Sequence, residues 1–164
     1  MMIKVISSLI LIIILLVFVY SPVLAQDSTP SATLKVGHIA NVVERLKEKI
    51  TLFFKFSSND KLDYYKYLTD KRLAEIAYTI ENKDVDRVEE TASRYSTTLG
   101  KLNEFVLSNK LLTQKEEIIN IMKHHEKVIG SLQSNFKFDS GWWLALQHDL
   151  NTIKIFSDKL DNLR

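Results

Sequence analysis

Apolar residues recur at the 3.6-residue period of an α-helix along most of the chain beyond residue 35, and short polar breaks interrupt them. The clearest example is the stretch 45–75, in which RLKEKITLFFKF is followed by the break SSND and then by KLDYYKYLTDKRLAE. Only 4 Gly and 2 Pro occur among 164 residues, which favours long helices over a loop-rich or all-β fold. The pattern therefore predicts an all-α fold.

Five amphipathic helices are expected, over residues 36–56, 59–82, 85–109, 113–136 and 141–163. Ser57 or Ser58 is positioned to cap the second helix, Asp84 the third, and Thr113 the fourth through a capping box with Glu116. The long regular helices predict an up-and-down bundle of four or five helices. The stripe of the first helix is expected to face its core, and consists of Ile39, Val42, Val43, Leu46, Ile50, Phe53 and Phe54.

Residues 1–25 have the form of a signal peptide. Lys4 precedes an apolar run over residues 5–19, and the run ends before Val23-Leu24-Ala25, which suits cleavage after Ala25. The apolar run, about 15 residues, is shorter than the roughly 20 residues that a membrane-spanning helix needs. An uncleaved anchor is the alternative, and it would be the chain's one contact with the membrane. Both alternatives predict export, with residues 26–35 as a flexible tether.

Beyond the tether, residues 36–110 are expected to form a three-helix unit. Residues 111–164 then form a helical hairpin that packs on this unit or extends its bundle. A net charge of +2, without a basic run longer than a pair, gives no reason to expect nucleic-acid binding. The chain has no cysteine, so the exported domain must be stabilised by its core rather than by disulfides.

The segment 45–77 resembles an uncharacterised family of exported or membrane-tethered bacterial helical domains, a domain of unknown function. Residues 45–49 (RLKEK) and 52–56 (LFFKF) match the first helix of the family pattern, and residues 72–75 (RLAE) match the second. The chain departs from the pattern at residues 36–39 (VGHI) and at Ser57-Ser58, where the family carries proline. The resemblance implies a helical fold and export, and it supplies no active-site residue.

Two polar residues fall on apolar stripes. His125 lies in the middle of the fourth stripe, where it could be a hydrogen-bonded core residue, a ligand for a metal or small molecule, or a pH switch. Its neighbours His124 and Glu126 point around the helix rather than along one face, so no metal-ligand pair is predicted within this helix. Arg72 lies on the core face of the second helix. It is expected to pair with a carboxylate, for example from the Glu89-Glu90 region, or to hold an acidic ligand.

Four aromatic residues are candidates for an interaction surface. Tyr64, Tyr67 and Tyr78 lie on the side of the second helix opposite its core face, so they predict either a second packing neighbour or a contact with a partner or a glycan. Trp142 precedes Trp143 at the start of the fifth helix, where it either covers the rim of the bundle or contacts a sugar or membrane surface.

The chain contains no Gly-rich phosphate loop and no recognised nucleophile motif, so no enzyme activity, catalytic residue, metal site or cofactor is predicted. The leading hypothesis is a non-enzymatic exported domain that acts by protein–protein contact, or structurally, at the cell envelope. Its partner would be an envelope protein or a second copy of the chain. The alternative is a metal or small-ligand sensor centred on His125.

Overall fold

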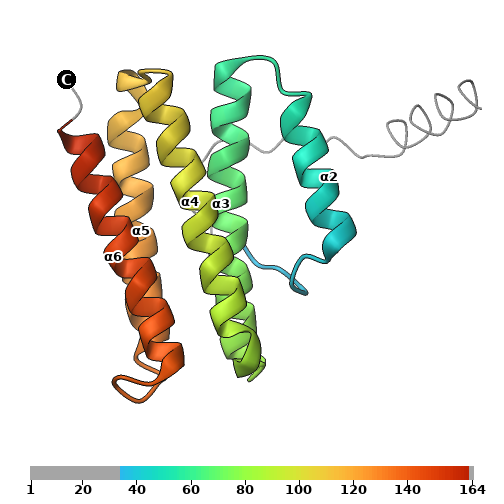
Figure 1. Ribbon diagram of the computed structural model, residues 1–164, viewed down its shortest axis with the longest axis vertical. Coiled ribbons are helices and arrows are strands. Elements are labelled where there is room, and N and C mark those ends of the chain that lie inside the picture. The colour runs from blue at the N-terminus through green and yellow to red at the C-terminus, as the bar shows by residue number, and fades with distance from the viewer. Residues whose placement is uncertain (1–33, 163–164) are drawn as a thin grey trace, which may run out of the picture.

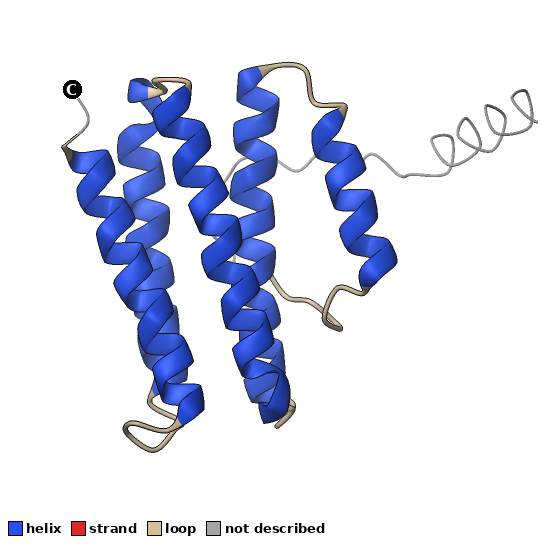
Figure 2. Ribbon diagram, viewed as in Figure 1, coloured by secondary structure: helices blue, strands red, loops and turns tan. Residues whose placement is uncertain are grey.

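The computed structural model describes residues 34–162, and they form helices joined by short loops (Figures 1 and 2). The long helices are α2 (Val42–Phe53), α3 (Ser58–Glu81), α4 (Val88–Ser108), α5 (Lys115–Gln133) and α6 (Gly141–Asp161). Short 3-10 turns at Val85–Arg87 and Leu112–Gln114 lead into α4 and α5. No strand occurs in this part of the chain, so the all-α prediction is confirmed. The predicted signal peptide lies outside the described residues.

Helices α3 to α6 form a bundle, and α2 stands beside it next to α3 (Figure 1). Within the bundle α3 packs against α4, α4 against α6 and α6 against α5, with a smaller contact between α3 and α5. Helices α4 and α5 are therefore at opposite corners, and the link between them crosses the end of the bundle. Residues 111–162 complete this bundle rather than forming a separate body.

The core lies between these four helices. The apolar stripe of α4 is at most 2% exposed along its whole length, and consists of Val88, Ala92, Tyr95, Leu99, Leu102 and Val106. The facing side chains from the other helices are Ile76, Ile118, Met122, Ile129, Leu146, Ile153 and Leu160, all at most 1% exposed. A side chain buried in this way contributes roughly 1.5–3 kcal/mol. The apolar stripes of α3 to α6 thus form the core, and the outer residues of these stripes are half-buried.

Serine side chains cap two of the helices, and the cap at Ser57 is one that the sequence predicted. Ser57 Oγ accepts from the amide of Asp60 at 3.2 Å at the start of α3, and Ser140 Oγ accepts from that of Trp143 at 3.3 Å at the start of α6. The predicted caps Asp84 and Thr113 are wrong. The chain enters α4 and α5 through 3-10 turns, in which neither side chain accepts a capping hydrogen bond.

Helix α2 is shorter than the expected range 36–56. Asn41 and Glu44 form a reciprocal capping box, in which the Asn41 side chain accepts from the Glu44 amide at 3.0 Å and the Glu44 carboxylate accepts from the Asn41 amide at 2.9 Å. This cap starts the helix at Val42, and it ends at Phe53.

The orientation of α2 contradicts the sequence prediction. Its apolar stripe points away from the bundle, and Val42 is 70%, Leu46 56% and Phe53 75% exposed. Of the seven residues expected to face the core, only Ile39, which precedes the helix, is buried. The residue of α2 that is buried is Glu48. The stripe is therefore a surface feature.

Candidate functional site

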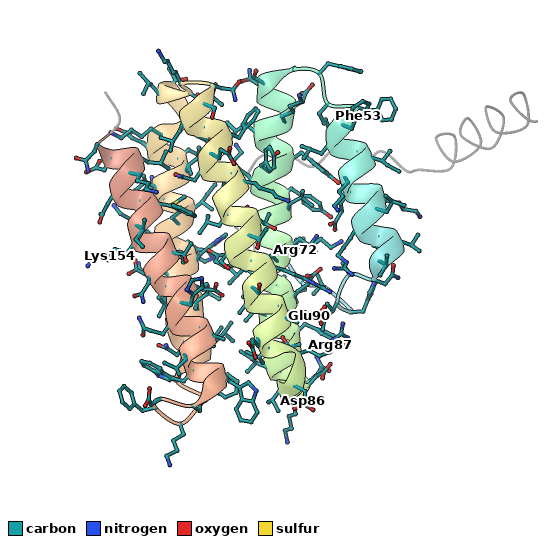
Figure 3. The ribbon with its side chains drawn as sticks, in the orientation of Figure 1. Phe53, Arg72, Asp86, Arg87, Glu90 and Lys154 are labelled. Atoms are coloured by element: carbon teal, nitrogen blue, oxygen red, sulfur yellow. The ribbon has the colours of Figure 1, made fainter. Side chains whose placement is uncertain are left out.

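A charged seam joins α2 to α3. Arg72 donates from Nη2 to Glu48 Oε2 and from Nη1 to Glu75 Oε1, the latter at 2.6 Å. Lys71 donates to the other oxygen of Glu48 at 2.7 Å. The side chains of Arg72, Glu48 and Glu75 are only 7%, 11% and 0% exposed, so these charges are largely removed from water. Arg72 lies on the side of α3 that faces α2 (Figure 3).

The same seam holds the segment that leads into α2. The amide of Ala40 donates to Glu75 Oε1 at 3.1 Å, and its carbonyl accepts from Arg94 of α4 at 3.3 Å. Both Ile39 and Ala40 are buried. The start of α2 is thus attached by backbone hydrogen bonds to charged side chains from two helices.

This attachment determines which side of α2 faces solvent. Successive residues of a helix are about 100° apart, so Leu46 and Ile50, two positions either side of Glu48, point to the opposite side. Since Glu48 points to α3, the stripe points outward. We call Val42, Val43, Leu46, Ile50 and Phe53 the apolar face of α2. It is continued in the following loop by Phe54 and Phe56, which are 45% and 85% exposed.

A groove lies between α2 and α4, with α3 as its floor. Its volume is about 210 Å³. Arg45, Lys49 and Leu52 line it from α2, Arg72 and Tyr65 from α3, and Arg94, Thr98 and Lys101 from α4. We call this cavity the basic groove, because its lining includes five cationic side chains and one carboxylate, that of Glu48.

The positive charge of the basic groove is not balanced within the described residues 34–162. Glu48 is already paired with Arg72 and Lys71, and Arg94 pairs with Glu90. Neither Lys49 nor Lys101 takes part in an ion pair in this part of the chain. The Nε of Arg45 is buried and makes no hydrogen bond. The groove is therefore an electrostatically favourable place for an anionic group.

The bundle contains a polar chain centred on His125. Its Nε2 lies 2.8 Å from Asp70 Oδ1, and its Nδ1 lies 3.1 Å from the Tyr95 hydroxyl. A neutral imidazole satisfies both contacts when Nε2–H donates to Asp70 and Nδ1 accepts from Tyr95. His125 is 2% and Tyr95 0% exposed. The row of hydrogen-bonded groups, carboxylate, imidazole and hydroxyl, therefore resembles a catalytic triad only in the order of those groups. The buried hydroxyl cannot reach a substrate.

The space beside His125 is small. A cavity of about 40 Å³, lined in part by Asp70, Leu73 and His124, has room for about one water molecule. Among residues 34–162, no three His, Cys, Asp or Glu side chains gather where they could hold a metal ion. The geometry around His125 is that of a hydrogen-bonded core residue.

Asp149 of α6 is the second unusual polar group of the core. It is 0% exposed, and neither of its carboxyl oxygens makes a hydrogen bond. Burial raises the pKa of this carboxyl from 3.8 to about 8, and the nearby Ser96 hydroxyl acts in the opposite direction. Burial also raises the pKa of Tyr95 well above 10, with the charges of Asp149 and Asp70 adding to the effect. The charge of Asp149 therefore acts on Tyr95, which hydrogen-bonds to His125.

Two of the predicted tyrosines of α3, Tyr64 and Tyr67, lie half-buried near α2. Tyr64 and Tyr67 stack with their ring centroids 5.8 Å apart, and the ammonium of Lys55 lies 5.9 Å from the Tyr64 ring centroid. Partial burial raises the pKa of Tyr64, while a hydrogen bond from Thr51 of α2 opposes the effect. Tyr78 is also half-buried. The side of α3 that carries these tyrosines therefore faces a neighbouring helix at Tyr64.

Trp142 lies at the far end of the bundle, where α6 begins. It is 39% exposed, and its ring centroid is 5.7 Å from that of Phe136. The neighbouring Trp143 contacts Phe138 at 4.7 Å. Both tryptophans thus contact phenylalanines of the loop between α5 and α6. Helix α6 and helix α2 lie on opposite sides of the molecule (Figure 1), so Trp142 and the Tyr64–Tyr67 pair do not form one surface.

Arg72 does not pair with the carboxylates that the sequence suggested. Glu90 pairs instead with Arg87 and Arg94. Arg72 pairs instead with Glu75 of the same helix and with Glu48 of α2. The apolar stripe of α2 was expected to face inward, which left Glu48 on the solvent side. The one sequence feature that points to the contact of Glu48 with α3 is its position on the side of α2 opposite Leu46 and Ile50.

The comparison with protein families matches residues 42–137, more than half of the 164 residues, to a family described as Domain of unknown function (DUF5667). The match covers α2 to α5, so it extends beyond the three-helix unit expected to end at residue 110. Comparisons with curated proteins and with solved structures found no match. Within the described residues, no helix has the length and apolarity needed to cross a membrane. The chain belongs to the DUF5667 family of domains of unknown function.

Proposed function

We propose that this protein is a non-enzymatic docking domain of the cell envelope, and that it binds an α-helix of a partner protein through the apolar face of α2. The observation that carries the proposal is the outward orientation of this face, with Leu46 56% and Ile50 43% exposed. Contiguous exposed apolar residues are typical of protein interaction sites. A twelve-residue helix such as α2 offers a ridge about 18 Å long, which suits a second helix.

The attachment of α2 supports this role. A buried ion pair and backbone hydrogen bonds keep the helix folded on the bundle, so the apolar face is held ready without a partner. A pre-organised face reduces the entropy lost on binding. The export predicted from residues 1–25 would deliver the domain to the envelope, and intact mass of the exported protein would show whether those residues are removed.

The charged groups of the structure support a non-enzymatic reading. In the basic groove the one carboxylate is paired with two cations, so no general base is available there. The Asp70–His125–Tyr95 chain ends in a hydroxyl that is 0% exposed.

Site-specific photo-crosslinking in the native cell tests the proposal. A photoreactive residue at position 46 or 53, on the apolar face, is expected to give one discrete adduct with another protein. The same residue at position 154, on α6 and far from α2, is the control and is expected to give none (Figure 3). An adduct of twice the mass of the chain would assign the face to self-association. Equal crosslinking at all three positions, or none, would contradict the proposal.

A further inference from the structure

The basic groove adjoins the apolar face of α2, and the two share the same helix. Lys49 lies four residues before Phe53, so the two side chains are neighbours on the helix surface. Arg45 lies one turn before Lys49 and lines the groove. A helix bound along the apolar face would therefore have one of its flanks over the groove.

The charges around the apolar face favour an acidic partner. Arg45, Lys47 and Lys49 of α2 are not in ion pairs within the described residues. The two acidic residues of α2 are engaged: Glu44 with His38 and the helix cap, and Glu48 with Arg72 and Lys71. The accessible rim of the apolar face is thus cationic. Two copies of such a rim would repel, which disfavours a second copy of this chain as the partner.

The volume of the groove favours a ligand that inserts a side chain over one that presents a flat surface. A cavity of about 210 Å³ can accommodate a carboxylate-bearing side chain between α2 and α4. The guanidinium of Arg45 lines the same cavity and makes no hydrogen bond or ion pair within the described residues, so its terminal N–H groups are free to act as donors. An arginine paired with a carboxylate forms a strong charge-assisted hydrogen bond.

We infer that the basic groove binds glutamate or aspartate side chains from one flank of the partner helix, so that the partner is an acidic amphipathic helix. This inference rests on the proposed function, and it adds the chemical class of the partner. The apolar face supplies contact area, and the groove selects helices with carboxylates along one side. Lys49 and Lys101 attract the carboxylates, and Arg45 donates the hydrogen bond.

Two synthetic helical peptides provide the test. Both carry the same leucine stripe, and they differ only in three flanking positions, which are glutamate in one peptide and glutamine in its twin. Binding to the full-length protein is measured by fluorescence anisotropy at low ionic strength. We expect the glutamate peptide to bind about ten-fold more tightly than the glutamine twin, because it gains charged hydrogen bonds in the groove.

Variants separate the groove from the apolar face. In the Lys49→Gln/Lys101→Gln variant the ten-fold difference is expected to fall to about two-fold or less, while the affinity for the glutamine twin is unchanged. Lys123→Gln/Lys127→Gln, which removes the same charge from exposed positions of α5, is the matched control and is expected to retain the difference. Leu46→Ser/Ile50→Ser is expected to weaken both peptides equally.

The possible failures are distinguishable. Equal binding of the two peptides to the unaltered protein would overturn the groove inference and leave the docking face in place. Failure of both peptides to bind would overturn both. An equal loss of the ten-fold difference in the Lys123→Gln/Lys127→Gln control would show that net charge alone is responsible. That result would overturn the groove inference.

Two competitors test whether the negatively charged ligand is an acidic helix, a free carboxylate or an anionic lipid. Sodium acetate at the same carboxylate concentration is expected not to compete, and full competition would assign the groove to free carboxylates. Vesicles containing phosphatidylglycerol that displace both peptides would assign the apolar face to a lipid surface. Either result would overturn the acidic helix as the partner.

Discussion

The carboxylate of Glu48 accepts a hydrogen bond from Arg72 across the seam between α2 and α3, and this contact determines which side of α2 faces solvent. Lys71 binds the second oxygen of Glu48, and Glu75 binds Arg72 from within α3. A buried ion pair of this kind contributes more to specificity of arrangement than to net stability, because desolvation offsets much of the attraction.

Glu48→Ala is expected to release α2 from the bundle without unfolding α3 to α6. The substitution leaves Arg72 with Glu75 as its remaining partner, and it removes the one buried side chain of α2. We expect the free energy of local opening of α2 to fall by about 1–3 kcal/mol. Hydrogen exchange followed by mass spectrometry would show faster exchange in residues 42–53 and unchanged exchange in α4.

Lys47→Ala is the matched control, since Lys47 is exposed on the same helix. Replacing both charges, in Glu48→Leu/Arg72→Leu, is expected to restore part of the protection because no charge of the pair is then buried alone. Global destabilisation by Glu48→Ala as large as that of a core deletion would contradict the peripheral role of α2.

Leu46→Ser is expected to leave the stability of the protein almost unchanged. Leu46 is 56% exposed and loses little buried area on substitution, so the free energy of unfolding should change by less than about 0.5 kcal/mol. Leu99→Ser, at a position that is 0% exposed, is the comparison and should cost about 3 kcal/mol or more. Urea denaturation followed by circular dichroism measures both. A large cost for Leu46→Ser would mean that the stripe of α2 is part of the core.

Periodicity predicted the bundle well because burial in α4, α5 and α6 follows the apolar stripes. Leu99 and Ile129 lie on these stripes, and both are fully buried. The same rule failed for α2, because a stripe records which residues share a face and not what that face contacts. There the pairing of Glu48 with Arg72 decided the orientation, and pairings between helices are not visible in a single sequence.

The polar groups of the core were predicted only in part. His125 stood out because it interrupts an apolar stripe, and the residue is only 2% exposed. Its partners Asp70 and Tyr95 come from other helices, 55 and 30 residues away in the chain. Asp149 gave no signal, since an aspartate beside a histidine on an amphipathic helix is usually on the solvent side. Helix–helix geometry was needed to identify these residues as neighbours.

Tyr95→Phe is expected to destabilise the protein by about 1–2 kcal/mol, because it leaves the buried Nδ1 of His125 without a donor. Combining it with His125→Ala gives a double-mutant cycle, and we expect a coupling energy of about 1 kcal/mol between the two side chains. Tyr78→Phe, at a half-buried position of α3, is the control and should change stability by less than about 0.5 kcal/mol. A coupling energy of zero would contradict the hydrogen bond.

Asp149→Asn is expected to stabilise the protein at neutral and alkaline pH. The pKa of the Asp149 carboxyl is raised by burial from 3.8 to about 8, so the folded state binds this proton more tightly than the unfolded state does. Stability from this group is therefore fully present below about pH 4, decreases as the pH rises through this window, and is lost above about pH 8. The isosteric amide keeps the volume of the side chain and never ionises.

The gain should consequently depend on pH. Each pKa unit corresponds to about 1.4 kcal/mol, and relaxation of the buried site reduces the full value, so we expect a gain of about 2–4 kcal/mol at pH 8 and little difference at pH 4. Urea denaturation at several pH values measures this dependence. Asp158→Asn, at an exposed position of the same helix, should show no such dependence. An Asp149→Asn variant with the same pH profile as the unaltered protein would show that Asp149 is solvated and ionised in the fold.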